Sequence, residues 1–371
     1  MNPLQLNGQR LSQHELLHGS ASLEAALAPL PETEQQPLRD FLQQWFDPTV
    51  TTIAAQTSGS TGPPKTILLS RRQLLASASA TAEYFHFQAG QTALLPLSVR
   101  FIAGKMMVVR AWLSGLQLQL VPPSNNPLEW VDATSRFDFA VLVPLQLEKL
   151  LEQQQLHRFG KLLLGGADLP PQLKQGVLAQ SVPVYQGFGM TETVSHIALR
   201  RLNGPQPDEG YRALPGIRLA VDERSCLRIT GPATDHSWVQ SNDMVTLLAA
   251  DRFLWRGRYD LVINSAGIKV ALEEIESRIH ELIPTDDCFD WMRGLPLAVG
   301  SMPHPRFGET AALWVEGGAP TEDERVRSLL CFKTHMPLGW APNAVFVVHE
   351  LPRLASGKID RKSLRAPYNG L

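Results

Sequence analysis

Cysteine is scarce in this chain, with three residues among 371: Cys226, Cys288 and Cys331. Their number is odd and no two form a CxxC pair, which argues against a zinc or redox motif, so we expect reduced thiols that act as packing residues. Net charge is also low, because 34 Lys and Arg face 36 Asp and Glu and leave a formal charge of -2. No overall positive field would draw the protein to nucleic acid or to anionic lipid.

Long hydrophobic runs are absent as well. The most apolar stretch, residues 93–120, is interrupted by Arg100, Lys105 and Arg110, and it falls short of the roughly 20 apolar residues that a membrane span needs. Residues 1–10 contain no basic start followed by an apolar run, so no secretory signal is expected. We expect a cytoplasmic protein with no membrane span.

The chain contains enough hydrophobic residues to form more than one hydrophobic core. Hydrophobic residues make up 44% of the sequence and charged residues 19%, a composition typical of folded globular proteins. The length exceeds the about 250 to 300 residues at which a single core usually stops growing. Two or more domains are therefore expected.

The hydrophobic pattern changes twice along the chain. Residues 1–50 have helical periodicity, and from Thr51 short β-rich runs alternate with helical segments, which predicts a layered α/β core. The β-rich runs are 66–69, 93–95, 116–121, 139–143 and 161–164. After Gly204 the chain becomes mostly β, and near Asp260 a new pattern begins with a strand and a helix over 271–282. We predict a large N-terminal domain, 1–259, and a small α+β C-terminal domain, 260–371.

A polar loop between two apolar runs has the composition of a phosphate-binding site. It contains Thr57, Ser58, Gly59, Ser60, Thr61, Gly62 and Lys65. Glycines let backbone N–H groups approach phosphate oxygens, hydroxyls add donors, and the lysine adds positive charge. Pro64 precedes Lys65, so the second glycine of a Walker A motif is missing. A plain Ser/Gly/Pro-rich surface turn remains the alternative reading of this loop alone.

Further motifs follow in a fixed order. They are Gly-Gly-Ala (165–167), Gly-Phe-Gly-Met-Thr-Glu-Thr (187–193), Ser-Asn-Asp (241–243), Gly-Arg-Tyr-Asp (257–260), Gly-Ile-Lys (267–269) and Pro-Arg-Leu-Ala-Ser-Gly-Lys-Ile-Asp-Arg (352–361). In this order and spacing the chain resembles the adenylate-forming superfamily of acyl-CoA synthetases, adenylation domains and luciferases. The resemblance covers roughly residues 51–365 and implies that family's α/β fold with a mobile C-terminal lid. It also implies a shortened N-terminus.

The resemblance implies a two-step reaction that uses ATP, Mg²⁺ and CoA. A carboxylate attacks the α-phosphate of ATP, and a thiol then attacks the acyl-adenylate. Lys358 matches the lysine that bridges the substrate carboxylate and the α-phosphate, Glu192 matches the carboxylate that holds Mg²⁺, and Thr191 would give a hydroxyl to the α-phosphate. Without the motif, Lys358 would be read as a solvated lysine and Glu192 as a surface charge.

The same resemblance assigns the nucleotide and hinge residues. Asp243 matches the ribose-binding aspartate, with Ser241-Asn242 where the family commonly has Thr-Gly, and Arg258 would assist at the ribose or phosphate. The residues implied around the adenine and phosphates are Gly166, Ala167, Gln186, Gly187, Phe188 and Gly189. Asp260 falls at the family hinge, and Gly267 and Lys269 belong to the face that would guide CoA.

The acyl substrate is indicated by residues 95–110 and 189–196. Together with the short N-terminus they look most like the o-succinylbenzoate-CoA ligases of menaquinone synthesis. That diacid is activated at one carboxylate, and the other needs a cation or several donors. Lys105 and Arg110 are the candidate cations, and Ser195 and His196 are possible polar contacts. Phe101 takes the aromatic position of the acyl pocket that the resemblance implies. Lys105 and Arg110 are five residues apart on an expected helix, so the spacing does not place both on one face, and both could be ordinary charges at an interface.

Three alternatives remain open. The chain could activate another aryl or fatty acid, or load a carrier protein as a standalone adenylation domain. It could also be a nucleotide-binding regulatory protein without catalysis, against which the presence of Lys358 and Glu192 argues. The expected partners are small molecules, namely a carboxylic acid, ATP and CoA, and a homo-oligomer is left open.

Overall fold

The computed structural model describes residues 3–56, 65–165, 169, 171–265, 267–305, 308–353, 359–361 and 363–364. The chain forms two compact units. The larger contains Met1–Ala220, Arg228–Gln240 and Leu247–Leu254, and the smaller contains Val221–Leu227, Ser241–Thr246 and Trp255–Leu371. Because these units interleave along the sequence, two domains that meet at Asp260 stay a prediction.

The central sheet of the larger unit is built mainly from parallel strands. These strands are β5 (Thr92–Leu95), β6 (Gln117–Leu120), β7 (Phe137–Leu142), β8 (Phe159–Leu164), β9 (Val184–Met190), β10 (Ser195–Arg201) and β11 (Tyr211–Ala213). Their order is β11-β10-β9-β8-β7-β5-β6. Pairing is parallel from β6 to β9, whereas β10 is antiparallel to both β9 and β11. The alternation of strands and helices predicted from Thr51 onward is confirmed.

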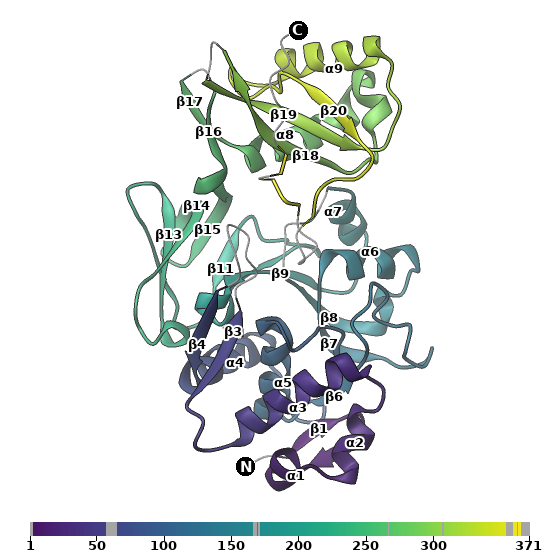
Figure 1. Ribbon diagram of the computed structural model, residues 1–371, viewed down its shortest axis with the longest axis vertical. Helices are drawn as coiled ribbons and strands as arrows, with labels where there is room; N and C mark the ends of the chain where they lie inside the picture. Colours follow the sequence, from purple (N-terminus) through teal and green to yellow (C-terminus); the bar gives the residue numbers. More distant parts are fainter. Residues whose placement is uncertain are drawn as a thin grey trace. The chain divides into compact units, whose positions relative to one another are not determined.

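Helices cover both faces of this sheet, as Figure 1 shows. They are α4 (Arg71–Phe85), α5 (Ile102–Ser114), α6 (Pro144–Glu152) and α7 (Pro171–Leu178). Successive strand residues point to opposite faces. Phe139 and Val141 of β7 accordingly share a core with α4 and α5, whereas Ala140 and Leu142 share the other core with α6 and α7. The result is a three-layer α/β/α arrangement.

The first residues of the chain extend the same sheet. The elements are β1 (Leu4–Leu6), β2 (Gln9–Leu11), α1 (Gln13–His18), α2 (Ala21–Leu27) and α3 (Glu32–Phe46). The helical prediction for 1–50 is confirmed for the three helices and is wrong for residues 4–11. There, β1 pairs in parallel with β6 and antiparallel with β2. Strands of three residues are too short for a periodicity to distinguish them.

The remaining strands of this part form a hairpin and a β section. The hairpin joins β3 (Thr52–Gln56) to β4 (Thr66–Ser70), and the β section contains β12 (Arg218–Val221), β13 (Cys226–Thr230), β14 (Val239–Ala249) and β15 (Arg252–Arg258). The mostly β stretch predicted after Gly204 is confirmed. The chain passes from one unit to the other within β13, β14 and β15.

A buried asparagine ties three segments of the larger unit together. Asn203 is 1% exposed; its side-chain nitrogen donates to the carbonyl oxygens of Val177, Gln180 and Val182, and its side-chain oxygen accepts from the Val184 amide. Removing a buried amide leaves its backbone partners unsatisfied.

Asn203→Ala is expected to lower the free energy of unfolding by about 2 to 4 kcal/mol, measured by chemical denaturation. Asn125→Ala removes an exposed amide and serves as the control, with an expected change within about 0.5 kcal/mol. Equal values for the two variants would show that the Asn203 network does not stabilise the fold.

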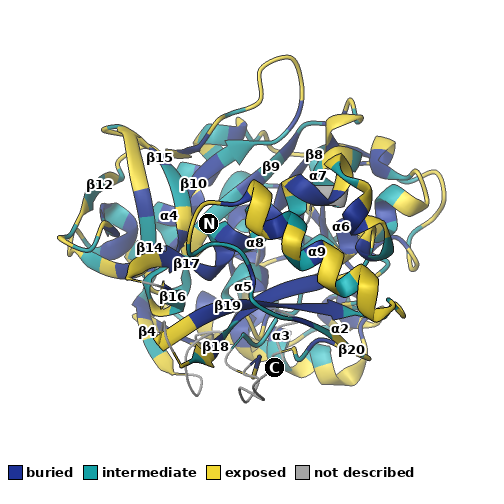
Figure 2. Cartoon of the chain, turned by 90° about the horizontal axis from the view of Figure 1, so that it is seen from above, coloured by how far each residue is buried: buried dark blue, intermediate teal, exposed yellow. Residues whose placement is uncertain are grey.

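The smaller unit has its own sheet and its own core. Its elements are β16 (Val262–Ser265), β17 (Ile268–Ala271), α8 (Leu272–Leu282), β18 (Leu297–His304), β19 (Gly308–Glu316), α9 (Glu322–His335) and β20 (Val345–Val348). The strand order is β17-β16-β19-β18, and β20 pairs in parallel with β19. Figure 2 shows the buried β19 and the exposed outer side of α9. Leu313 and Val315 pack with residues of α8 and α9, whereas Ala312 and Trp314 face a second cluster containing Leu351 and Leu364.

Two cysteines of the smaller unit depart from the prediction. Cys288, in the 3-10 helix Asp287–Met292, and Cys331, on α9, form a disulfide although 43 residues separate them. The prediction of reduced thiols is therefore wrong for these two. The rings of Phe289 and Phe332 stack at 4.5 Å and join the same two elements, a tertiary contact that cysteine spacing cannot reveal. Cys226 is a buried free thiol.

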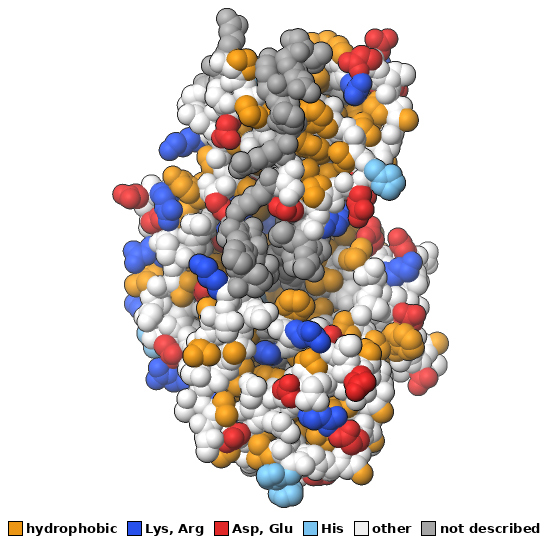
Figure 3. Space-filling model, viewed as in Figure 1, with side chains coloured by type: hydrophobic (Ala, Val, Ile, Leu, Met, Phe, Trp, Pro, Cys, Tyr) orange, Lys and Arg blue, Asp and Glu red, His pale blue; other side chains and the backbone are white. Residues whose placement is uncertain are grey.

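No described helix could span a membrane, and the face drawn in Figure 3 carries charges of both signs. Among the described residues, no helix is both long and apolar enough to cross a bilayer. On the face drawn in Figure 3, Lys and Arg side chains are interspersed with Asp and Glu, in keeping with the formal net charge of -2.

Candidate active site

Several predicted site residues follow the carboxyl ends of the parallel strands. Phe101 comes after β5 and immediately precedes α5, Gly165 follows β8, and Thr191 and Glu192 follow β9. Strand order reverses between β5 and β7, because the chain proceeds from β5 to β6 on one side and from β7 through β8 to β9 on the other. Open α/β sheets bind ligands at the carboxyl ends beside such a reversal.

The predicted phosphate loop connects β3 and β4. Its residues Thr57, Ser58, Gly59, Ser60, Thr61 and Gly62 lie outside the described residues, as do Gly166, Ala167 and Lys358. Lys65, just before β4, is described and exposed. The Thr191 hydroxyl lies 3.5 Å from the carbonyl oxygen of Gln56, the last residue of β3. Thr191 therefore lies beside the last described residue before the predicted loop.

Glu192 presents an exposed carboxylate on the 3-10 turn Thr191–Thr193. The turn is held by Thr193, whose hydroxyl oxygen accepts from the Met190 amide at 3.0 Å. No described cation forms an ion pair with Glu192, and it belongs to no described cluster of three metal-ligating side chains. A single hard oxygen ligand fits Mg²⁺, which usually takes one or two carboxylates and completes its shell with water and substrate phosphate.

The predicted adenine wall lies on β9 beside β10. Gln186 is buried, and its side-chain oxygen accepts from Arg200 of β10. Phe188 contacts Phe253 edge to face at 5.0 Å between ring centroids, and it also contacts Tyr211 at 5.6 Å. These aromatic contacts fix the ring of Phe188. Gly187 lies between Gln186 and Phe188 on the same strand.

The predicted ribose residue belongs to the smaller unit. Asp243 is 9% exposed, and one of its carboxylate oxygens accepts from the indole N–H of Trp255 at 2.9 Å. The Ser241 hydroxyl oxygen accepts from the Asp243 amide and donates to the Leu227 carbonyl. Ser241 thus links the Asp243 amide on β14 to the Leu227 carbonyl on β13.

The other predicted residues of the smaller unit lie at the end of β15 and on the β16–β17 hairpin. The Arg258 guanidinium donates to both carboxylate oxygens of Asp260, at 2.9 and 3.3 Å. Gly267 occupies the exposed β16–β17 turn with φ of 84°, a left-handed conformation that favours glycine. Lys269 is exposed on β17.

Glu273, near the start of α8, was not anticipated from the sequence. It is 9% exposed, its Oε2 atom has no hydrogen-bond partner among the described residues, and a Cβ at Gly257 would lie 3.1 Å from that atom. Burial raises the pKa of Glu273 to about 7, although the nearby Arg361 charge opposes the rise. The carboxyl is therefore partly protonated at neutral pH.

Stability should depend on the protonation of Glu273. Its pKa in the folded state is about 7, above the ordinary value of 4.5 for a glutamate. The contribution of the protonated carboxyl to stability is therefore complete below the unfolded pKa and is lost as pH rises through the folded pKa. Between pH 5 and pH 8 the wild type should lose about 2 kcal/mol more unfolding free energy than Glu273→Gln. Denaturation at both pH values tests this, with the exposed Glu281→Gln as the control. Parallel pH profiles for wild type and Glu273→Gln would contradict the assignment.

Three of the five predicted acyl-site residues meet inside the larger unit. Arg110 of α5 is 1% exposed, and its Nη2 atom lies 3.4 Å from Nδ1 of His196 on β10. The Ser195 hydroxyl lies 3.5 Å from the same nitrogen. No carboxylate among the described residues pairs with Arg110, and its Nε atom has no hydrogen-bond partner there. Burial lowers the pKa of Arg110 to about 9, so the guanidinium stays charged at pH 7.

The other two acyl-site candidates lie elsewhere. The Lys105 ammonium donates to the Val99 carbonyl at 2.9 Å and lies 5.1 Å from the centroid of the Phe41 ring. Phe101 is 50% exposed at the start of α5. Of the two cations on α5, the structure therefore brings only Arg110 to Ser195 and His196.

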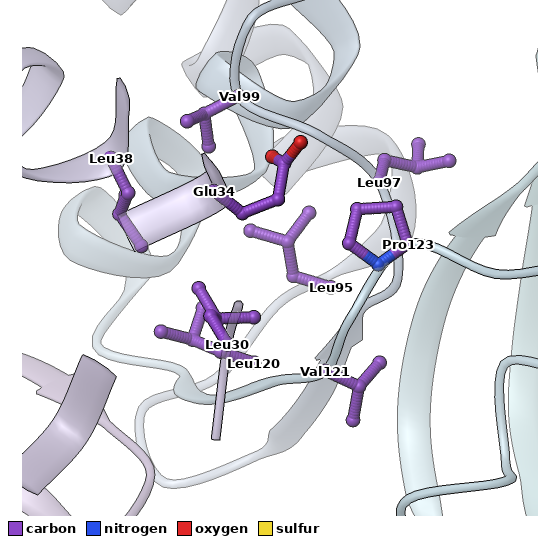
Figure 4. Close-up of a pocket in the computed structure, with 9 residues that line it drawn as sticks. All are labelled: Leu30, Glu34, Leu38, Leu95, Leu97, Val99, Leu120, Val121 and Pro123. Carbon is purple, nitrogen blue, oxygen red and sulfur yellow. The ribbon is translucent and has the colours of Figure 1, made fainter. Parts of the chain in front are cut away.

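A separate pocket beside α3 does not suit an acid. Figure 4 shows Glu34 as the one charged side chain among otherwise apolar residues that include Leu38, Leu95 and Leu120. The Glu34 carboxylate lies 3.8 Å from the Arg100 Nε. A dicarboxylate would be repelled by Glu34. By contrast, a mostly apolar hollow between α4 and β10 is lined by His196 and Ser77 and contains no carboxylate.

Residues 5–228 match the model of the AMP-binding enzyme family. The chain belongs to this family. A solved structure from Dyadobacter fermentans, described as an acyl-CoA synthetase (AMP-forming)/AMP-acid ligase II-like protein, is 36% identical, with 90% of this chain and 93% of that chain covered and a TM-score of 0.59. The resemblance inferred from the motifs and the α/β fold class are both confirmed.

Two further proteins are similar over most of the chain. A protein named probable 2-succinylbenzoate–CoA ligase from Mycobacterium tuberculosis is 27% identical over 344 residues, 86% of this chain and 85% of that protein. The o-succinylbenzoate-CoA synthetase of Bacillus subtilis, solved with its acyl-adenylate intermediate, has a TM-score of 0.72 at 20% identity and covers 99% of this chain and 83% of its own. At that identity the match shows the fold.

Proposed function

We propose that this AMP-binding enzyme converts o-succinylbenzoate, ATP and CoA into o-succinylbenzoyl-CoA, AMP and pyrophosphate. The observation that carries the proposal is the buried charge of Arg110, which has no carboxylate partner among the described residues. A buried guanidinium without a counter-ion is costly, so the site favours a substrate that brings an anion. The names of similar proteins support the same diacid.

In the first step, a carboxylate oxygen of the acid attacks the α-phosphorus of ATP, and the bond to the pyrophosphate oxygen breaks. We assign Thr191, Lys65 and the loop from Thr57 to Gly62 to the phosphates. Lys358 neutralises charge at the reacting oxygens. Mg²⁺ bound to Glu192 would supply further charge neutralisation at the phosphates. Stabilising charge that develops in the transition state is the main task of such a site.

Nucleotide positioning is assigned to two further groups of residues. Gly166, Ala167 and the β9 residues Gln186, Gly187, Phe188 and Gly189 would surround the adenine, and Asp243 with Arg258 would hold the ribose. Asp243 is supported by its bond from Trp255, which orients the carboxylate.

In the second step, the CoA thiol attacks the acyl carbon, and AMP leaves as the carbon–oxygen bond breaks. We place a hinge at Asp260, between the lobes 1–259 and 260–371, so that Gly267 and Lys269 replace Lys358 at the nucleotide. Such an exchange lets one site serve two reactions. The single turn Tyr259–Leu261, in which Asp260 is exposed and the two flanking residues are half-buried, supports a hinge at this point.

ATP–pyrophosphate exchange tests the first step. Purified protein with Mg²⁺ and o-succinylbenzoate is expected to return labelled pyrophosphate into ATP, and omission of the acid should abolish the exchange. If exchange occurs only with a fatty acid or another aryl acid, that acid and not o-succinylbenzoate is the substrate. No exchange with any acid would favour a nucleotide-binding protein without catalysis.

A further inference from the structure

A chain of hydrogen bonds runs from α4 through β10 to Arg110. Thr81 of α4 is fully buried, and its Oγ1 atom lies 2.9 Å from the Ser77 carbonyl oxygen and 3.0 Å from Nε2 of His196. His196 in turn contacts Arg110 through Nδ1. Helices α4 and α5 pack side by side in the larger unit (Figure 1). Thr81 and Arg110 therefore hold the same imidazole from two helices.

The direction of each hydrogen bond follows from the groups involved. A carbonyl can only accept, so the single Thr81 hydroxyl proton goes to Ser77 and the Thr81 oxygen must accept from Nε2–H of His196. A guanidinium can only donate, so Nδ1 must carry a lone pair for Arg110. Together these bonds select the neutral Nε2–H tautomer of His196.

The electrostatics agree with a neutral imidazole. His196 is 7% exposed, and burial together with the Arg110 charge holds its pKa well below the ordinary value. A protonated His196 would place two cations against each other inside the protein. His196 therefore serves as a neutral acceptor that leaves the guanidinium charge uncancelled.

The backbone before His196 is held in an uncommon shape. Val194 and Ser195 have φ of 53° and 77°, in the left-handed region that a β-branched residue rarely adopts. The Ser77 hydroxyl donates to the Val194 carbonyl at 2.7 Å. A Cβ at Gly189 would lie 2.0 Å from the Ser195 carbonyl oxygen, so the facing strand needs glycine there. Such strain persists only where surrounding contacts impose it, and it is frequent at functional sites.

We propose that Thr81 and His196 are positioning residues that hold the Arg110 guanidinium in one orientation as the receptor for the second carboxylate of a dicarboxylic acid. This inference rests on the proposed function. It changes the role of His196 from a substrate contact to a support of Arg110, and it adds Thr81. Neither residue takes part in the bonds that form and break.

We call the hydrogen-bonded chain from Thr81 through His196 to Arg110 the relay. The kinetics of Thr81→Val test it, because valine keeps the shape of threonine and removes the hydroxyl oxygen that accepts from His196. The variant is expected to raise the KM for o-succinylbenzoate about three- to tenfold, with kcat and the KM for ATP unchanged. Thr81→Ser should restore the wild-type value. Thr230→Val is the control, since the buried Thr230 hydroxyl has no hydrogen-bond partner among the described residues. Two monoacid analogues, each lacking one carboxylate, show which carboxylate is recognised, and the analogue lacking that carboxylate should be insensitive to Thr81→Val.

The outcomes separate the two proposals. Wild-type activity on the diacid with an unchanged KM in Thr81→Val would overturn the relay alone. An equal rise in KM for the diacid and for the monoacid that lacks the recognised carboxylate would do the same. A wild-type protein that does not use the diacid would overturn both proposals.

The tautomer of His196 can be measured directly, so it tests the proposed hydrogen bonds without an activity assay. Nitrogen-15 NMR of histidine-labelled protein, with His196→Gln to assign the signal among ten histidines, is expected to show a protonated Nε2 and an unprotonated Nδ1 from pH 6 to pH 8. A proton on Nδ1, or an imidazolium in that range, would overturn the proposed relay. Loss of the tautomer preference in Thr81→Val would support it.

Discussion

Arg110→Met is expected to lower kcat/KM for o-succinylbenzoate by roughly 100-fold, because the second carboxylate would then enter a buried site without a charged partner. Methionine fills much of the volume of the arginine stem and adapts to its surroundings. For the monoacid that lacks the recognised carboxylate, kcat/KM should change less than about threefold. The variant should unfold at the same temperature as the wild type or higher, because it removes an unpaired buried charge.

Lys105→Met is the matched control for Arg110→Met. It removes the other cation of α5, whose ammonium is bound to the Val99 carbonyl beside Phe41. The ratio of diacid to monoacid kcat/KM is expected to stay at the wild-type value. A larger change in this ratio for Lys105→Met than for Arg110→Met would show that the carboxylate receptor has been assigned to the wrong residue.

Lys358→Ala is expected to reduce ATP–pyrophosphate exchange by roughly 100- to 1000-fold, because the charge that bridges the acid and the α-phosphate is lost. The variant should still convert a preformed acyl-adenylate and CoA into the thioester at a rate close to wild type. The exposed Lys333→Ala is a control for the loss of one positive charge from the same part of the chain. Equal losses in both half-reactions for Lys358→Ala would contradict its assignment to the first step.

Local hydrophobic patterns in the sequence predicted many of the strands and helices correctly. Short β-rich runs such as 139–143 and 161–164 correspond to β7 and β8, because both faces of these strands are buried and leave a continuous apolar signal. The helix predicted over 271–282 corresponds to α8, whose residues Ile275 and Ile279 lie in the core. The pairing of β1 with β6 depends on contacts more than a hundred residues apart along the chain, which no local pattern contains.

The site was predictable only in part, for a similar reason. Motif order nominated Arg110, Ser195 and His196 but could not show that α5 and β10 bring them together. Thr81 looks like an ordinary helical residue, although Ser77 and Thr81 stand one turn apart on the buried face of α4, and two hydroxyls at that spacing were the available signal. The spacing of Cys288 and Cys331 along the sequence does not indicate that they form a disulfide.

The most direct test of the central claim is the complete reaction followed by mass spectrometry, with purified enzyme, ATP, Mg²⁺, CoA and equal concentrations of o-succinylbenzoate, its two monoacid analogues and a fatty acid. We expect o-succinylbenzoyl-CoA as the main thioester, with AMP formed in equal amount. Preferential formation of a fatty acyl-CoA, or of a monoacid thioester, would contradict the account.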